Sequence, residues 1–228
     1  MSKQYEIRAV LLDLDGTLLD TIHDLAEAAN RTLAELGRPT RSVAEIHSFV
    51  GKGIPNLVRR CLGGDGPVSD VDMEMALPVF RRHYAFVNGS QTRIYPGVVE
   101  GLAEMRAMGF ALGCVTNKSG EFTMPLLERM GIADFFGAVI SGDTLPVKKP
   151  DPAMLRHACD RLGVGVADAL MVGDSENDAL AARACEMPVL LMTYGYSEGK
   201  PVDSIECDGL VSSLSEVVPM IRLRRTGR

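Results

Sequence analysis

Four short polar segments in this 228-residue chain carry side chains that can do chemistry. Two acids, Asp13 and Asp15, follow an apolar run and stand just before Gly16, a residue type common in turns. The other segments are Thr116-Asn117-Lys118, Lys148-Lys149-Pro150 and Gly173-Asp174-Ser175-Glu176-Asn177-Asp178. The four together supply carboxylates, a hydroxyl, an amide and a lysine, which are groups that can bind and transfer a phosphate.

The carboxylates predict a site for a small hard cation. Oxygen ligands from Asp13, Asp15 and Asp174, together with waters and a substrate oxygen, suit Mg²⁺. The cation and Lys149 would neutralise a phosphate, and Asp13 would be the oxygen nucleophile that forms an aspartyl-phosphate. Asp15, held by the turn after it, would protonate the leaving oxygen and later activate water.

Each polar segment comes after a run with the pattern of a buried strand, or close behind one. Residues 7–12 are almost continuously apolar, which indicates a strand buried on both faces of a parallel sheet. Further strands are predicted over 111–116, 137–140, 169–172 and 188–192, with helices over 96–108, 119–131, 151–162 and 175–184. This alternation predicts a doubly wound parallel sheet. Ligands of such sheets bind beyond the carboxyl ends of the strands, so the four segments should meet at one site.

A wholly helical stretch, residues 20–90, interrupts the alternation. Apolar residues spaced three and four apart predict a helix over 22–36, and Thr21-x-x-Asp24 resembles a capping box at its start. More helices are predicted over 43–50, 55–62 and 71–87, with a break or kink at Pro78. We therefore predict a core domain over 1–19 and 91–228 and an inserted helical domain over 20–90.

Composition narrows the function classes. The chain has 24 basic and 30 acidic residues, a net charge of −6, which argues against nucleic-acid binding. No apolar run approaches the length of a membrane span, so we expect no membrane partner. Five cysteines without metal-binding spacing indicate a reduced, cytoplasmic protein. The expected partner is a small phosphorylated acid or sugar, bound by a monomer or homodimer.

The chain resembles the haloacid dehalogenase (HAD) superfamily phosphatases, whose four motifs match Asp13-Leu14-Asp15-Gly16-Thr17, Thr116-Asn117, Lys149-Pro150 and Gly173-Asp174-x-x-x-Asp178. The resemblance implies a Rossmann-like α/β core with an inserted C1-type helical cap. It implies Asp13 as the nucleophile and Asp15 as the acid and base. The implied ligands of Mg²⁺ are Asp13, the backbone carbonyl of Asp15, and Asp174.

The resemblance also assigns roles to the remaining motif residues. Lys149, directly before the proline, would contact the phosphate and the nucleophile, with Lys148 as the alternative in the same motif. Thr116 would contact the phosphate. Asp178 matches the second acid of the fourth motif, which acts on the metal indirectly or through water.

Within the superfamily the chain resembles bacterial phosphoglycolate phosphatases, through residues 20–25, 50–53 and 95–98. This implies a Mg²⁺-dependent phosphomonoester hydrolase that converts 2-phosphoglycolate to glycolate and phosphate. Phosphatases of other small sugar phosphates and phosphoglucomutase-like phosphotransferases share these features. A phospho-acceptor signalling module, from another class, has a similar sheet and acidic site. The inserted helical domain suits a closed pocket better than a partner surface.

A second anion site is predicted in the loop Val50-Gly51-Lys52-Gly53, which opens a helix of the inserted domain. Gly51 and Gly53 allow backbone amides to approach a ligand, the helix N-terminus favours an anion, and Lys52 adds an ammonium group. We predict that this loop binds a substrate carboxylate, the alternative being a solvated Lys52. Thr17 and Asn117 are also predicted as substrate-binding residues.

Overall fold

The computed structural model describes residues 4–224. Residues 1–3 and 225–228, which the predicted core boundaries include, lie outside the described part. Six parallel strands form the central sheet in the order β6-β5-β2-β7-β8-β9. They are β2 (Ala9–Leu12), β5 (Ala111–Val115), β6 (Ala138–Ile140), β7 (Ala169–Gly173), β8 (Val189–Met192) and β9 (Gly209–Val211). The predicted doubly wound fold is confirmed.

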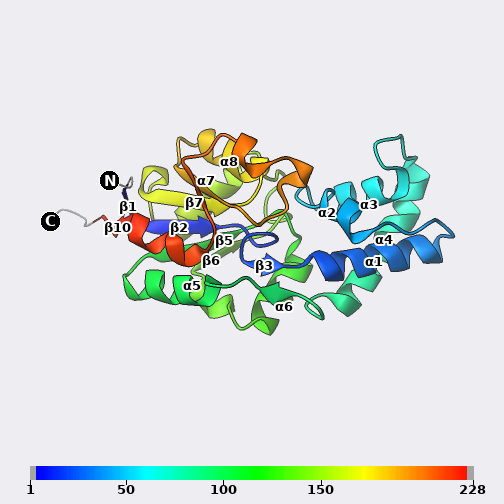
Figure 1. Ribbon diagram of the computed structural model, residues 1–228, viewed down its shortest axis with the longest axis horizontal. Helices are drawn as coiled ribbons and strands as arrows, with labels where there is room; N and C mark the ends of the chain where they lie inside the picture. Colours follow the sequence, from blue (N-terminus) through cyan, green and yellow to red (C-terminus); the bar gives the residue numbers. More distant parts are fainter. Residues whose placement is uncertain (1–3, 225–228) are drawn as a thin grey trace.

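Helices cover both faces of this sheet (Figure 1). On one face lie α5 (Val98–Ala107) and α6 (Gly120–Arg129), and on the other α7 (Ala153–Leu162) and α8 (Glu176–Arg183). Strand β2 explains why the sequence run is apolar throughout. Its Val10 and Leu12 pack in the cluster with α5 and α6, whereas Ala9 and Leu11 pack in the cluster with α7 and α8.

The single strand predicted over 7–12 is wrong, because the chain changes partners at Arg8. Residues before it form β1 (Tyr5–Ile7), which pairs with β10 (Ile221–Leu223) outside the main sheet. The Arg8 N–H donates to the carbonyl of Asp168, and its carbonyl accepts from the Ala111 N–H. One residue thus links the two sheets.

The segment after β2 folds into four helices beside the sheet (Figure 1). They are α1 (Ile22–Glu35), α2 (Val43–His47), α3 (Ile54–Gly63) and α4 (Asp70–Val87). They enclose their own apolar cluster, in which Leu33, Phe80 and Tyr84 are almost fully buried. The antiparallel pair β3 (Leu19–Asp20) and β4 (Arg93–Ile94) joins these helices to the sheet. We call this helical part the cap and the rest the core.

The structure contradicts the predicted capping box at the start of α1 and the predicted break in α4. Thr21 and Asp24 form no capping box, since the Thr21 hydroxyl donates to Asp15 and the Asp24 carboxylate accepts bonds from residues 89–92. Helix α4 continues through Pro78, so the predicted break is absent, and the alternative, a kink, stays a prediction. Pro78 lies on the exposed face, where water can satisfy the carbonyl that loses its partner.

Short 3₁₀ helices complete the core, mostly towards the C-terminus. They are η1 (Ala133–Phe135), η2 (Val166–Asp168), η3 (Ser197–Gly199), η4 (Val202–Ser204), η5 (Leu214–Glu216) and η6 (Val218–Met220). Across residues 4–224, no helix combines the length and apolar character that a membrane crossing requires.

Candidate active site

The four polar segments meet where the cap faces the carboxyl ends of the core strands. Asp13 follows β2, Thr116 follows β5 and Asp174 follows β7, the three neighbouring strands at the middle of the sheet. Lys149 comes from the loop after β6 and reaches Asp13, with 2.9 Å between Nζ and Oδ1. The parallel sheet therefore brings together residues that lie far apart in the sequence, such as Asp13 and Asp174.

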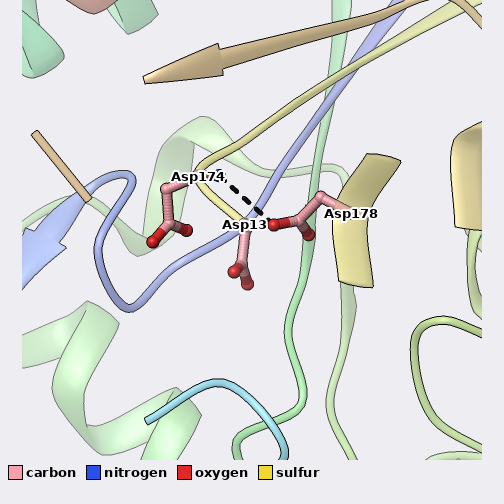
Figure 2. A group of neighbouring side chains, drawn as sticks. All are labelled: Asp13, Asp174 and Asp178. Carbon is pink, nitrogen blue, oxygen red and sulfur yellow. Dashed lines mark hydrogen bonds between the residues drawn. The ribbon is translucent and has the colours of Figure 1, made fainter. Parts of the chain in front are cut away.

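Three acids form a buried cluster at this point. Oxygens of Asp13, Asp174 and Asp178 lie within 4.8 Å of one another, and Figure 2 shows the three side chains together. Burial raises the pKa of Asp13 to about 7, because the opposing effect of Lys149 is incomplete and the charge of Asp178 adds to the rise. Burial and the charge of Asp13 raise the pKa of Asp174 well above its usual range. A positive ion beside these carboxyl groups would favour their ionised forms, so the cluster suits a bound cation.

The three acids differ in what their oxygens already bind. Asp178 Oδ1 accepts from Lys149 Nζ at 2.7 Å. Its Oδ2 accepts from the Ser175 hydroxyl at 2.7 Å and from the Asp174 N–H at 3.2 Å, the dashed line in Figure 2. Asp178 is thus committed to protein groups, whereas Asp13 and Asp174 fit the role of metal ligands. Asp13 and Asp174 each keep oxygen lone pairs that protein donors do not use.

The Asp174 carboxylate is held from two sides. Its Oδ1 accepts from the Thr17 hydroxyl at 3.0 Å, and its Oδ2 accepts from the Tyr196 N–H at 2.6 Å. Gly16, at φ +87°, and Gly195 pack against it so closely that a Cβ would lie 2.3 and 2.0 Å from its atoms. Thr17, predicted to bind substrate, is fully buried and uses its hydroxyl to hold Asp174.

Lys149 and Lys148 lie in different places. Lys149 is buried, and its Nζ also donates to the carbonyl of Val115 at 2.6 Å. Burial lowers the pKa of Lys149, but the charges of Asp13 and Asp178 outweigh it, so the pKa is raised and the group is an ammonium. The Nζ of Lys148 instead lies beside Gly53 of the cap loop. The structure thus places Lys149 next to the predicted nucleophile.

Lys118 lies in one of the four segments expected to meet at the site, but we predicted no role for it. Its Nζ lies 2.9 and 3.0 Å from the two carboxylate oxygens of Asp15, and the side chain is 3% exposed. The Thr21 hydroxyl donates to the same carboxylate at 2.7 Å. Burial lowers the pKa of Lys118, but Asp15 and Tyr84 raise this pKa by a larger amount, so the net shift is upward. Its position directly after Thr116-Asn117 was the available sequence signal.

Asn117, predicted to bind substrate, ties three loops together. Its side-chain amide donates to the carbonyls of Gly51 and Lys149, both at 2.9 Å, and its Oδ1 accepts from the Lys149 N–H. Its side-chain groups are therefore used within the protein. The Thr116 hydroxyl accepts from the Lys118 N–H at 3.2 Å and keeps its own proton to donate.

A cavity of about 40 Å³ lies between cap and core. The core contributes Asp13, Asp15, Thr116, Asn117 and Lys118, and the cap contributes Leu25, Val50, Gly51, Gly53, Ile54, Leu57 and Tyr84. Lys52 does not line it. The Lys52 Nζ pairs with Glu198 Oε2 at 2.7 Å, and its side chain is 52% exposed.

Comparison with known proteins agrees with this arrangement. The model of the haloacid dehalogenase-like hydrolase family matches residues 7–186. A phosphoglycolate phosphatase of Nitrosospira multiformis is 50% identical over 219 residues, covering 95% of this chain and 96% of that protein. One of Thiobacillus denitrificans is 45% identical over 217 residues, covering 94% and 96%.

The fold is also shared with solved structures. The crystal structure of a predicted phosphoglycolate phosphatase from Haemophilus somnus 129PT has a TM-score of 0.88 and 28% identity, covering 93% of this chain and 97% of the other. The family match covers both the strand that carries Asp13 and the strand that carries Asp174. Because the family model matches most of the chain and a relative is 50% identical over nearly its whole length, the chain belongs to the haloacid dehalogenase-like hydrolases.

Proposed function

We propose that this hydrolase uses Mg²⁺ to cleave 2-phosphoglycolate into glycolate and phosphate. The observation that carries the proposal is the position of Asp13, which lies 2.9 Å from the Lys149 ammonium and lines a cavity between cap and core. A carboxylate beside a cation at such a cavity is suited to attack a phosphate dianion. Relatives 45–50% identical to this chain carry the name phosphoglycolate phosphatase, which supports the choice of substrate.

The reaction proceeds in two steps on this chain's own residues. In the first, an Asp13 oxygen forms a bond to phosphorus, the ester P–O bond breaks, and Asp15 gives its proton to the leaving oxygen. In the second, a water attacks the phosphorus and passes its proton to Asp15, which frees phosphate and restores Asp13. Lys149 and the Thr116 hydroxyl bind the phosphate oxygens in both steps.

The metal would be held by Asp13, Asp174 and the backbone carbonyl of Asp15. When bound, Mg²⁺ supplies positive charge that offsets the charge of the carboxylates and of the phosphate. Asp178 and Thr17 keep the ligands oriented through the hydrogen bonds described above.

The cavity supports a small substrate. At about 40 Å³ it has room for a few water molecules, and apolar cap side chains such as Leu25, Ile54 and Leu57 form its roof. A two-carbon leaving group suits this space in the closed arrangement better than a hexose does. We further propose that the protein acts in a reducing cytoplasm, since its five cysteines are all unpaired.

A phosphate-release screen with the full chain tests the proposal. The substrates are 2-phosphoglycolate, glycerol phosphate, glucose 6-phosphate and glucose 1-phosphate, each with Mg²⁺ and with a chelator. We expect kcat/KM to be highest for 2-phosphoglycolate, to vanish with the chelator, and to vanish in a folded Asp13→Asn variant. Isomerisation of glucose 1-phosphate would point to a mutase, and a stable aspartyl-phosphate without turnover would point to a signalling module.

A further inference from the structure

The two steps above leave one buried cation of the cavity without a role. Lys118 lines the cavity, is 5% exposed, and takes no part in nucleophilic attack or in phosphate binding. Among the described residues that line the cavity, it is the one with a positive charge. Asp15 offsets the cost of burying this ammonium, and the position of Lys118 on the cavity wall also places it within reach of a bound substrate.

We propose that Lys118 determines specificity by binding the carboxylate of the substrate. The inference rests on the proposed function, because it names the residue that binds the carboxylate end of phosphoglycolate. It also replaces Lys52 in the role that sequence analysis gave to the cap loop.

The constitution of the substrate fixes how far apart the two recognition points can be. In phosphoglycolate the carboxyl carbon is attached to the carbon that bears the ester oxygen. The group that protonates this oxygen must therefore lie close to the group that binds the carboxylate. Asp15 is the proton donor, and Lys118 Nζ lies within 3.0 Å of both its oxygens. An ammonium in this position can reach the carboxylate while the ester oxygen faces Asp15.

The surroundings of Lys118 favour an anionic ligand. Its Nζ lies 4.9 Å from the centroid of the Tyr84 ring, and the cap roof opposite is apolar, with Leu25 and Leu57. An ammonium has three donors, and Asp15 leaves capacity for a further acceptor. In a wall of low polarity, a charge-assisted bond to a carboxylate is strong, whereas a neutral head group offers the remaining donor of the ammonium only a weaker bond.

The other lysines nearby are engaged elsewhere. Lys149 contacts Asp13 and Asp178 at the phosphate end. Lys52 pairs with Glu198, whose other oxygen accepts from the Asn177 amide at 2.5 Å, so the Lys52 ammonium is held outside the cavity. Lys118 is thus the lysine positioned to bind the carboxylate of the substrate.

The test compares two esters that differ in one group. These are 2-phosphoglycolate and 2-hydroxyethyl phosphate, in which a neutral CH₂OH replaces the carboxylate. The variants are Lys118→Met, Lys118→Arg and Lys52→Met, with Lys200→Met, an exposed lysine paired with Glu176, as the matched control. The measured quantity is the ratio of kcat/KM for the two esters, with circular dichroism and Tm to check folding.

We expect Lys118→Met to lower this ratio on the order of 100-fold, as fits the loss of a charge-assisted bond. Lys118→Arg should keep part of the ratio, and Lys52→Met and Lys200→Met should keep all of it. An equal fall for both esters in Lys118→Met would overturn the proposal, since Lys118 would then act only through Asp15. A collapse of the ratio in Lys52→Met alone would overturn it too. If the unaltered protein shows no preference for phosphoglycolate, the proposed function itself fails, which is a separate outcome.

Discussion

At the scale of single residues, partners rather than residue type decide what each acid does. Asp13, Asp174 and Asp178 are chemically identical and lie within 4.8 Å of one another. Asp178 accepts bonds from Lys149, Ser175 and the Asp174 N–H, which leaves it little capacity for a metal. The three aspartates therefore have two functions: Asp13 and Asp174 can bind a metal directly, and Asp178 supports them.

The support role of Asp178 can be measured apart from turnover. We expect Asp178→Asn to weaken Mg²⁺ binding by roughly 10- to 100-fold, because outer partners tune metal ligands to this extent. Titration calorimetry of the folded variant gives the dissociation constant, and Asp70→Asn, at an exposed acid in the first turn of α4 in the cap, is the control. Unchanged Mg²⁺ affinity in Asp178→Asn would contradict the supporting role.

The activity lost on replacing Asp15 should depend on the leaving group of the ester. We expect Asp15→Asn to lose at least about 100-fold in kcat/KM on an alkyl ester such as 2-phosphoglycolate, since its leaving oxygen needs a proton. On p-nitrophenyl phosphate the formation of the aspartyl-phosphate should be far less affected, because p-nitrophenolate leaves unprotonated. Rapid-quench measurement of the nitrophenolate burst tests this. Equal slowing of the first step for both esters would remove Asp15 as the acid.

At the scale of elements, two chain segments connect cap and core, and one acid, Asp24, links these two segments. Asp24, fully buried in the first turn of α1, accepts from the N–H groups of Gly89 and Gln91, both at 2.8 Å, and of Thr92 at 3.1 Å. The Thr92 hydroxyl adds a fourth bond at 2.6 Å. The outgoing helix and the returning segment are thereby fixed to each other just before β4.

Removing this acid should loosen the connection. We expect Asp24→Ala to reduce the free energy of unfolding by about 2–4 kcal/mol, because several buried donors lose their acceptor at once. Thr92→Val, which removes one of the four bonds, should cost only about 1 kcal/mol. Urea unfolding at constant m-value measures both. A smaller effect for Asp24→Ala than for Thr92→Val would show that water replaces the carboxylate.

At the scale of the whole molecule, local pattern revealed the sheet, and non-local contacts remained hidden. Apolar runs ending in polar residues located Asp13 and Asp174, because parallel strands bring their carboxyl ends together. Strands β9 and β10 have three residues each, of which only one is buried, so they give no apolar run to detect. Lys118 and Asp15 pair across 103 positions, a contact that no spacing encodes. The Lys52–Glu198 pair was missed for the same reason.

The acid cluster also couples metal binding to the stability of the whole fold. A carboxyl whose pKa rises on folding contributes stability that is fully present below its unfolded pKa and is lost as the pH rises through its folded pKa. For Asp13 these values are 3.8 and about 7, so the metal-free protein loses this contribution between about pH 4 and pH 7. Mg²⁺ binds the ionised form, so it should restore the stability most where the acid has lost its proton.

We therefore expect the rise in Tm on adding saturating Mg²⁺ to be larger near about pH 8 than near about pH 6, because at the lower pH the ion must displace a proton from Asp13. Differential scanning fluorimetry at several pH values measures this rise, and taking the difference with and without Mg²⁺ cancels the titrating groups that do not contact the ion, which leaves Asp13 and Asp174. In Asp13→Asn the neutral amide has no proton to lose, so the dependence should flatten as well as weaken. A Mg²⁺ effect equal at both pH values in the unaltered protein would mean that Asp13 is already ionised there, and that Lys149 offsets its burial completely.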